Sequence, residues 1–315
     1  MPGTDAIERP EPDRLGFAKS GFARSGFAGL DLARLRRAGP RKAWRKGARL
    51  LALRRAAAEA DAFLCSYPKS GRTWLRYVLS HYLDEVHALG ADIDLQTTFS
   101  LVPNFDGDPV RGIPAFRAGP ACGRAPLVLV SHLQPSRPLF RDRPVIFMTR
   151  DPRDVVVSAF YHATEHKKRF AGTMEAFLAH PELGLPAFVA YHGRWGAALL
   201  QRPHVVVTYE ALTAESVATV RRIVDFLGWP VDVAAIEKAV AMSSFDRMRR
   251  AEMRSGVPGH AYDRGNEEAL RVRKGRIGGF RDDLSDAQAR LVLDRVSAGL
   301  PPRVHRLLGY DAYAP

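Results

Sequence analysis

The stretch Phe63-Leu-Cys-Ser-Tyr-Pro-Lys-Ser-Gly-Arg-Thr-Trp74 is an apolar run that stops at a proline and a glycine and restarts with a helical pattern. A strand, a tight loop and a helix start in this order favour anion binding. The first-turn N–H groups lack intrahelical partners, and the helix dipole adds positive potential. Lys69 places a cation in the loop, and Ser70 and Thr73 supply hydroxyl donors. Gly71 allows the backbone to approach a ligand closely, so the sequence predicts an anion site here.

This loop differs from the Walker A pattern, because Lys69 precedes the glycine and no glycine stands five residues before Gly71. An ordinary strand-to-helix turn with a solvated lysine is therefore the alternative interpretation of the segment.

A second buried strand is predicted at Pro144–Thr149, where apolar residues follow one another without alternation. Asp151-Pro152 is typical of an N-cap followed by proline at the first helical position, so Arg150 lies at the strand end. Ser158 comes about two helical turns after Arg150 and can approach the same ligand. The alternative for Arg150 is a surface ion pair. Arg153 and Asp154 are expected to pair with each other or with solvent.

Three separated blocks of the chain resemble the sulfotransferases that use 3′-phosphoadenosine 5′-phosphosulfate (PAPS). Tyr67–Trp74 resembles the 5′-phosphosulfate loop of that family, and Arg150–Ser158 resembles its 3′-phosphate motif. Arg273-Lys-Gly-Arg-Ile-Gly278 resembles the C-terminal element that closes over the 3′-phosphate. The blocks occur in the order of the family and span residues 67–278.

The resemblance implies binding of PAPS and of its product PAP (3′-phosphoadenosine 5′-phosphate). The phosphosulfate end would be held by Lys69, Ser70, Gly71, Arg72, Thr73 and Trp74, and Trp74 would also stack on the adenine. The 3′-phosphate would be bound by Arg150, Ser158, Arg273, Lys274 and Gly275. Nucleotide contacts are further implied for Tyr209, Ser243 and Phe245.

The resemblance also implies a catalytic histidine at the end of a strand between the two main motifs. Leu127-Val-Leu-Val-Ser-His132 is an apolar run that ends in a histidine, so His132 is the candidate base. Imidazole suits this role because its ordinary pKa lies near neutrality. Lys69 is assigned to the bridging oxygen of the departing phosphate, where negative charge develops during an in-line displacement. No metal is part of this scheme.

The composition indicates one sizeable core. With 315 residues, of which 46% are hydrophobic and 26% charged, the chain is expected to form one domain of about 250 residues plus a tail. Cys65 and Cys122 are too few for a disulfide framework, which favours a reducing, cytoplasmic location. No apolar stretch approaches the length of about 18 residues that a membrane span needs.

The basic excess is concentrated near the start, where residues 1–60 hold 14 Lys and Arg against 6 Asp and Glu. We predict a disordered basic tail at 1–30, a basic helical extension at 31–60 and a single sulfotransferase domain at 61–315. The extension can pack on the core, lie on the anionic inner membrane surface or contact nucleic acid. No base-reading motif supports specific nucleic-acid binding.

The pattern of elements predicts an α/β fold in which helices flank a parallel sheet, similar to P-loop nucleotide-binding folds. Strands are expected at 61–67, 127–131, 144–149 and 204–208. Helices are expected near 73–88, 153–168, 187–200, 213–227, 232–241 and 286–299. Residues 92–126 and 251–270 are expected to be loops beside the acceptor site. Ligands bind such sheets at the strand carboxyl ends, where Lys69, His132, Arg150 and Tyr209 fall.

Two further patterns suggest metal binding. His162-Ala-Thr-Glu-His166 matches a zinc-hydrolase signature, but no third ligand is evident. Asp106 and Asp108 could chelate a cation, whereas an acidic loop turn is the simpler interpretation.

The sequence therefore predicts sulfuryl transfer from PAPS to a hydroxyl, or less readily an amine, of a glycan, glycolipid, small alcohol or phenol. A P-loop-type kinase is the enzymatic alternative. The other alternative is a non-catalytic basic module that binds nucleotide or a membrane surface.

Overall fold

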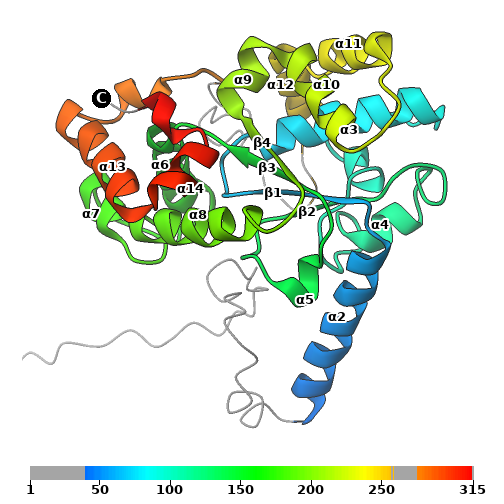
Figure 1. Cartoon of the computed structure of the whole chain (residues 1–315), viewed down its shortest axis with the longest axis horizontal. Coiled ribbons are helices and arrows are strands. Elements are labelled where there is room, and N and C mark those ends of the chain that lie inside the picture. Colours follow the sequence, from blue (N-terminus) through cyan, green and yellow to red (C-terminus); the bar gives the residue numbers. More distant parts are fainter. Residues whose placement is uncertain (1–39, 257, 259–274, 314–315) are drawn as a thin grey trace, which may run out of the picture.

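A single parallel sheet with strand order β2-β1-β3-β4 forms the centre of the molecule. The computed structural model describes residues 40–256, 258 and 275–313, which Figure 1 traces along the chain. The strands are β1 (Ala62–Ser66), β2 (Val128–Ser131), β3 (Val145–Thr149) and β4 (His204–Thr208). All four predicted strands and the predicted α/β class are confirmed, with strand bounds within one residue.

The helices surround this sheet. Their bounds are α2 (Pro40–Glu59), α3 (Arg72–His87), η1 (Thr97–Ser100), α4 (Ile113–Arg117), α5 (Arg137–Phe140), α6 (Pro152–Tyr161), η2 (His162–His166), α7 (Met174–Ala179), α8 (Leu185–Leu199), α9 (Tyr209–Ala214), α10 (Ser216–Phe226), α11 (Val233–Met242), α12 (Phe245–Ser255), η4 (Gly279–Asp282), α13 (Asp286–Gly299), α14 (Pro302–Leu307) and η5 (Tyr310–Tyr313). In Figure 1 one group, with α3, α10 and α11, lies above the strands, and a second group, with α8, α13 and α14, lies to their left.

The burial of the strands explains why they read as apolar runs. Every residue of β1, β2 and β3 is buried, as expected for parallel strands covered on both faces. Edge strand β4 instead alternates half-buried and buried residues. The principal core cluster includes Phe63, Phe147 and Trp195 from the sheet and α8.

Three sequence predictions about helices need correction. The helix expected at 153–168 is α-helical only to Tyr161 and continues as the π-helical turn η2. The helix expected at 213–227 is divided into α9 and α10 at Glu215, whose φ of −135° is not helical. The loop expected at 251–270 is helical to Ser255, because Met248 and Ala251 of α12 pack with Tyr77 and Phe99 in a separate hydrophobic cluster.

The remaining loop and tail predictions have mixed outcomes. Residues 92–126 are largely irregular but contain η1 and α4. The predicted tail at 1–30, and 259–270 of the second predicted loop, lie outside the described residues. Helix α2 lies within the range predicted as a basic extension, and its Leu53, Ala56 and Ala57 belong to the main core cluster.

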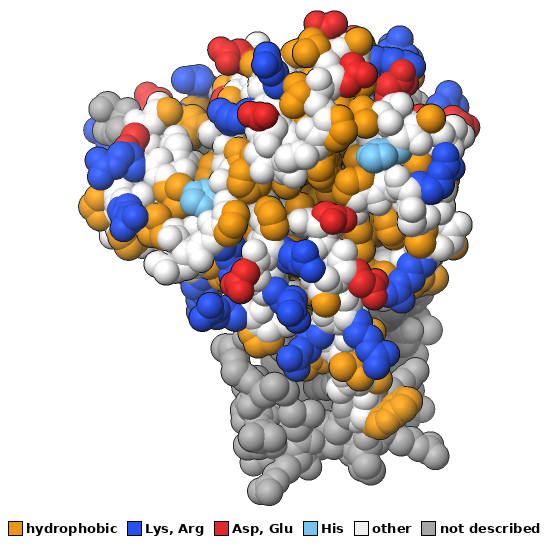
Figure 2. Space-filling view, turned by 45° about the vertical axis from the view of Figure 1, so that its right-hand side comes forward, with side chains coloured by type: hydrophobic (Ala, Val, Ile, Leu, Met, Phe, Trp, Pro, Cys, Tyr) orange, Lys and Arg blue, Asp and Glu red, His pale blue; other side chains and the backbone are white. Residues whose placement is uncertain are grey.

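Charged and apolar side chains are unevenly distributed over the surface. Figure 2 shows one face on which hydrophobic side chains gather near the middle and Lys and Arg side chains form a band below them. Trp44 of α2 is 75% exposed. Within the described residues, no helix is long and apolar enough to span a membrane.

We expect the free energy of unfolding to fall as the pH drops from about 6.5 towards 4, in part because of His192. This side chain is fully buried on α8, where its Nδ1–H donates to the Phe188 carbonyl. Burial lowers the pKa of His192 to about 4. The unfolded chain therefore takes up a proton at this residue in a pH range where the folded chain does not, so acid favours unfolding.

Urea denaturation of the wild type and of His192→Phe at several pH values between about 7 and 5 measures this contribution. The variant should lose less stability over that range. An equal loss in both proteins would contradict the assignment.

Candidate active site

The strand order reverses at β1, which pairs with β2 on one side and with β3 on the other. A crevice at the carboxyl ends of the strands is expected at such a switch point. The loop with Lys69 follows β1, and Arg150 follows β3. The two motifs therefore meet although 81 positions separate Lys69 from Arg150 in the printed numbering.

A cavity of about 630 Å³ opens at this edge of the sheet. It is lined by eleven of the predicted site residues: Lys69, Gly71, Arg72, Thr73, Trp74, His132, Arg150, Ser158, Tyr209, Phe245 and Gly275. Ser70 and Ser243 are buried and do not line it. Arg273 and Lys274 lie outside the described residues. The structure thus brings the described candidates together in or next to one cavity.

The loop after β1 is a tight turn with two residues in the left-handed backbone region. Lys69 and Gly71 have φ values of 73° and 90°, in the left-handed region. A Cβ on Gly71 would lie 2.4 Å from Cδ2 of Tyr209, so only glycine allows this contact. Gly71 is also the N-cap of α3 and provides no side-chain cap. The first-turn N–H groups of α3 thus have no side-chain acceptor at the cap.

His132 follows β2 and is held in one orientation by β1. Its Nδ1–H donates to the carbonyl of Ser66 over 2.7 Å. The hydroxyl of Tyr191 donates to the same oxygen over 2.8 Å. With Nδ1 protonated, Nε2 of the neutral ring carries the lone pair and can accept a proton.

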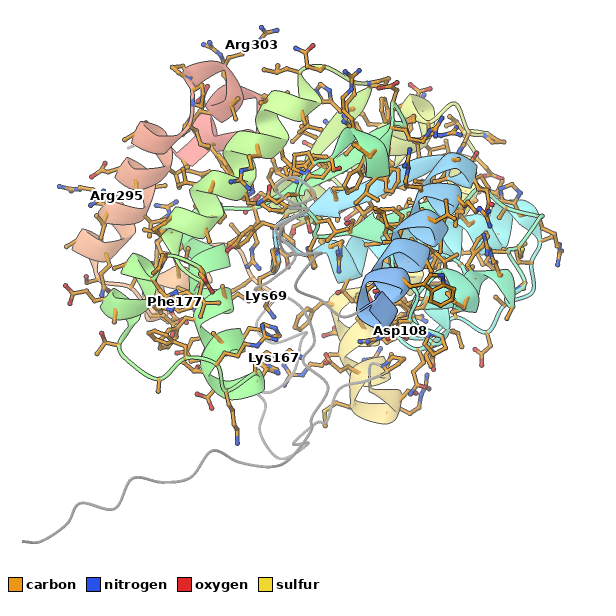
Figure 3. The ribbon with its side chains drawn as sticks, turned by 90° about the horizontal axis from the view of Figure 1, so that it is seen from below. Lys69, Asp108, Lys167, Phe177, Arg295 and Arg303 are labelled. Atoms are coloured by element: carbon orange, nitrogen blue, oxygen red, sulfur yellow. The ribbon has the colours of Figure 1, made fainter. Side chains whose placement is uncertain are left out.

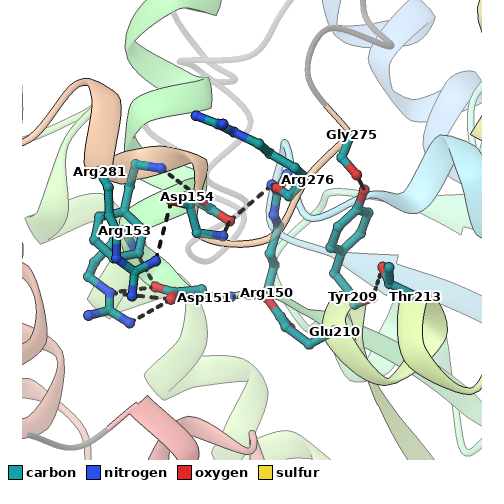
Figure 4. Close-up of polar contacts among 12 residues, drawn as sticks. Arg150, Asp151, Arg153, Asp154, Tyr209, Glu210, Thr213, Gly275, Arg276 and Arg281 are labelled. Atoms are coloured by element: carbon teal, nitrogen blue, oxygen red, sulfur yellow. Dashed lines mark hydrogen bonds and ion pairs between the residues drawn. The ribbon is translucent and has the colours of Figure 1, made fainter.

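Arg150 is the centre of a group of polar and aromatic contacts (Figure 4). Its NH2 group donates to Oδ2 of Asp154 and to the carbonyl of Arg276, both over 3.1 Å. Its guanidinium carbon lies 4.3 Å from the ring centroid of Tyr209, a cation–π contact. The Tyr209 hydroxyl donates to the Gly275 carbonyl over 3.1 Å, and burial raises the pKa of this hydroxyl.

Asp154 lies in the site, although the sequence prediction did not include it among the candidate residues. Its Oδ2 accepts the N–H of Gly278 over 3.0 Å, and its Oδ1 accepts the N–H of Phe280 over 2.9 Å. Its side chain is only 2% exposed. Asp154 therefore joins Arg150 to the C-terminal block that begins at Gly275. The available signal was the position of Asp154 inside the block Arg150–Ser158, because Arg150 precedes the N-cap Asp151 and shares no helix face with Asp154.

The predicted pairing of Arg153 with Asp154 is therefore wrong. Arg153 donates through Nε and NH2 to the carboxylate of Asp151, with the shortest contact at 2.7 Å. Asp151 also accepts the backbone N–H of Arg153, which confirms its prediction as the N-cap.

Aromatic side chains gather among the residues that the resemblance assigns to the adenine. The rings of Trp74 and Tyr209 meet edge to face with centroids 5.6 Å apart. The Trp74 indole N–H donates to the Ser243 carbonyl over 2.9 Å. A Cβ on Gly275, whose φ is 61°, would lie 2.1 Å from the ring of Phe245. Phe245 thus packs directly on the backbone of the closing block.

The two patterns that suggest metal binding lie in the loop with Asp106 and Asp108 and in the turn η2. Asp106 and Asp108 accept backbone N–H groups of their own loop, as in an acidic turn. His162 and His166 lie in η2 with ring centroids 5.3 Å apart. Among the described residues, no three His, Cys, Asp or Glu side chains form a group that could hold a metal ion.

Known proteins share this sequence pattern and this fold. The sulfotransferase domain family matches residues 59–298. The chain is 28% identical over 252 residues to sulfotransferase 2B1 of Mus musculus, covering 73% of this chain and 68% of the relative. It is 27% identical over 259 residues to 3-alpha-hydroxysteroid sulfotransferase of Cavia porcellus, covering 78% and 86%. For flavonol 4'-sulfotransferase of Flaveria chlorifolia the identity is 24% over 258 residues, covering 76% and 79%.

Two solved structures resemble the fold. Mouse sulfotransferase SULT7A1 complexed with PAP superimposes with a TM-score of 0.56 and 23% identity, covering 81% of this chain and 90% of that one. A retinol dehydratase in complex with retinol and PAP gives a TM-score of 0.58 and 17% identity, covering 78% and 82%.

We expect Asp154→Asn to weaken PAP binding by about tenfold or more, because a hydrogen bond to a charged group contributes about 1.5–3 kcal/mol. The amide has one acceptor oxygen, so it cannot accept from both backbone N–H groups and still face Arg150 as an anion. Titration calorimetry with PAP measures the effect. The matched control is Asp282→Asn, which neutralises an exposed carboxylate of the adjoining turn η4 that pairs with Arg276. Equal affinities of Asp154→Asn and the wild type would contradict the role of Asp154.

Proposed function

We propose a mechanism and an acceptor class for this chain, which belongs to the sulfotransferase domain family and is a PAPS-dependent sulfotransferase. It transfers the sulfuryl group to a hydroxyl of a small-molecule acceptor. The observation that carries this proposal is the meeting of the Lys69 loop and the Arg150 cluster in one cavity at adjacent strand ends.

The surroundings of this cavity fit a nucleotide with phosphates at both the 3′ and 5′ positions. Among the described residues, Oγ of Ser70, Oγ of Ser243 and Nε of Arg150 are buried without a hydrogen-bond partner. Buried polar atoms are nearly always satisfied, so the unpartnered Nε of Arg150, which lines the cavity, is consistent with a polar ligand, whereas Ser70 and Ser243 lie next to the cavity. Lys69 and the start of α3 would hold the 5′ end, and Arg150 and Ser158 the 3′-phosphate.

Two side chains of this chain carry the proposed chemistry. Bound PAPS supplies an activated sulfuryl group and a phosphate leaving group. Lys69 would stabilise the negative charge that develops on the bridging oxygen, which favours the transition state over the ground state. His132 would take the proton of the attacking hydroxyl at Nε2, since Nδ1 already donates to Ser66.

The acceptor end of the cavity favours a molecule with an apolar body. Phe99, Phe177, Leu183 and Met248 line the cavity and lie outside the three motif blocks. Relatives of the chain are named for hydroxysteroids and a flavonol, which are apolar molecules with hydroxyl groups. We therefore propose a compact apolar alcohol or phenol as the acceptor. The glycan and glycolipid acceptors, the cytoplasmic location and the membrane contact of the basic N-terminus stay predictions.

The two alternative functions lack comparable support. A P-loop-type kinase would place a lysine after the loop glycine, where this chain has Arg72. A non-catalytic nucleotide-binding module would not require the oriented histidine at the end of β2.

We expect Lys69→Ala and His132→Ala each to lower kcat by about two orders of magnitude or more, because one charge-stabilising group and one general base contribute at least this much. Mass spectrometry of sulfated products from PAPS and a panel of phenols and hydroxysteroids measures the loss.

The same variants separate binding from chemistry. His132→Ala should retain nearly normal PAP affinity by calorimetry, whereas Lys69→Ala should weaken it. The matched control is His87→Ala. This variant also removes a histidine, but His87 lies on a part of α3 that does not line the cavity, so PAP affinity and turnover should stay normal. Unchanged turnover in His132→Ala would remove this residue from the mechanism.

A further inference from the structure

Helix α8 donates two side-chain hydrogen bonds to the backbone around His132. The hydroxyl of Tyr191 donates to the carbonyl of Ser66, the last residue of β1, over 2.8 Å. The indole N–H of Trp195 donates to the carbonyl of Leu133, the residue after His132, over 3.0 Å. Residues four positions apart lie on one face of a helix, so a single face of α8 bonds to both strand ends.

The strand ladder does not reach His132. The register between β1 and β2 ends at Cys65 and Ser131, and β2 stands at one end of the strand order. The position of the histidine therefore depends on contacts outside the ladder. One of them is the N–H of Leu133, which donates to Oγ of Ser131 over 3.0 Å. The two donors of α8 supply further contacts, one on β1 and one on Leu133.

The histidine and the tyrosine share the carbonyl of Ser66. This oxygen accepts the Nδ1–H of His132 over 2.7 Å and the hydroxyl of Tyr191 over 2.8 Å. A carbonyl oxygen has two lone pairs and can accept both donors at once. Burial raises the pKa of the Tyr191 hydroxyl well above its usual range, so this group keeps its proton and donates. The orientation of the carbonyl in turn fixes the tautomer and the direction of the His132 ring.

Tyr191 and Trp195 are held in place by the core. Their side chains are 4% and 0% exposed, and neither lines the cavity. The ring of Phe147 on β3 has its centroid 6.4 Å from that of Tyr191 and 5.4 Å from that of Trp195. Closely packed rings have few alternative positions, so their polar atoms are fixed donors. An effect of either side chain on the reaction must therefore pass through the backbone that it binds.

The end of β1 also leads into the loop that carries the proposed leaving-group cation. Lys69 follows Ser66 by three positions and lines the cavity (Figure 3). His132 follows the neighbouring strand β2. The placement of the base relative to the cation thus depends on how these two strand ends lie, and α8 bonds to both of them.

We propose that Tyr191 and Trp195 are positioning residues for sulfuryl transfer, in which Tyr191 orients the His132 ring through the Ser66 carbonyl and Trp195 fixes the turn that follows. This inference rests on the proposed role of His132 as the base. In-line transfer needs closely aligned reacting atoms, and a misplacement of about 1 Å can lower the rate by about 100-fold.

Tyr191→Phe removes the hydroxyl and keeps the buried ring. We expect kcat of the full chain with PAPS and a hydroxysteroid alcohol to fall by about tenfold, because the base is less well aligned. The affinity for PAP, measured by calorimetry, should stay the same. Trp195→Phe removes the donor to Leu133 and should act in the same direction.

A double-mutant cycle separates positioning from a general loss of structure. Tyr191→Phe should lower kcat of the wild type but not that of His132→Ala, because that variant has no base to orient. The loss should also depend on the acceptor. It should be small for 4-nitrophenol at mildly alkaline pH, since this hydroxyl is largely ionised and needs no base, and larger for the hydroxysteroid alcohol.

The matched control is Tyr82→Phe, which removes another buried hydroxyl that donates to a backbone carbonyl, that of Pro230. Tyr82 does not line the cavity, so this variant should turn over normally. Unchanged kcat in Tyr191→Phe, an equal loss with and without the His132 imidazole, or a parallel loss of PAP affinity would overturn the proposal. The proposed function fails separately, if the wild type binds no PAP and forms no sulfated product.

Discussion

The buried contact between Asp154 and Arg150 is the interaction on which the arrangement of the site depends. Burying a carboxylate costs free energy that is recovered only when its oxygens are well paired. Here the guanidinium of Arg150 and the N–H groups of Gly278 and Phe280 provide these partners. One side chain thereby connects the end of β3, the first turns of α6 and the C-terminal block at Gly275–Gly278 (Figure 4). Removing any partner would leave a buried charge poorly compensated.

The same cluster connects the two ends of the proposed nucleotide site. The ring of Tyr209 lies against Arg150 on one side and against Gly71 of the loop after β1 on another. A larger residue at position 71 would push this ring away and disturb Arg150 as well. A shift of the loop after β1 would therefore displace the Tyr209 ring and, with it, Arg150 after β3. This contact is consistent with one ligand that touches both segments.

The sequence predicted the parts of the site that are local in the chain. The apolar runs of β1 to β4, the N-cap Asp151 and the glycine of the tight loop each depend on a few neighbouring residues. The prediction failed where the partner is remote. Asp154 bonds to residues 124 and 126 positions later, and no local pattern indicates such a pairing. The sequence predicts a loop from Ala251 onward where α12 continues to Ser255, because the burial of this helix against α3 and η1 is a tertiary contact.

The sequence by itself thus determined which chemical groups this protein carries and the order of its strands and helices along the chain, since hydrophobic periodicity and turn residues act over short distances. Only the tertiary structure decided which of these groups face one another. The reversal of strand order at β1 brings the Lys69 and Arg150 motifs into one cavity. The π-helical turn after α6 adds Lys167 and Arg169 to that cavity. These contacts are non-local, and their geometry follows from packing of the whole sheet and its helices.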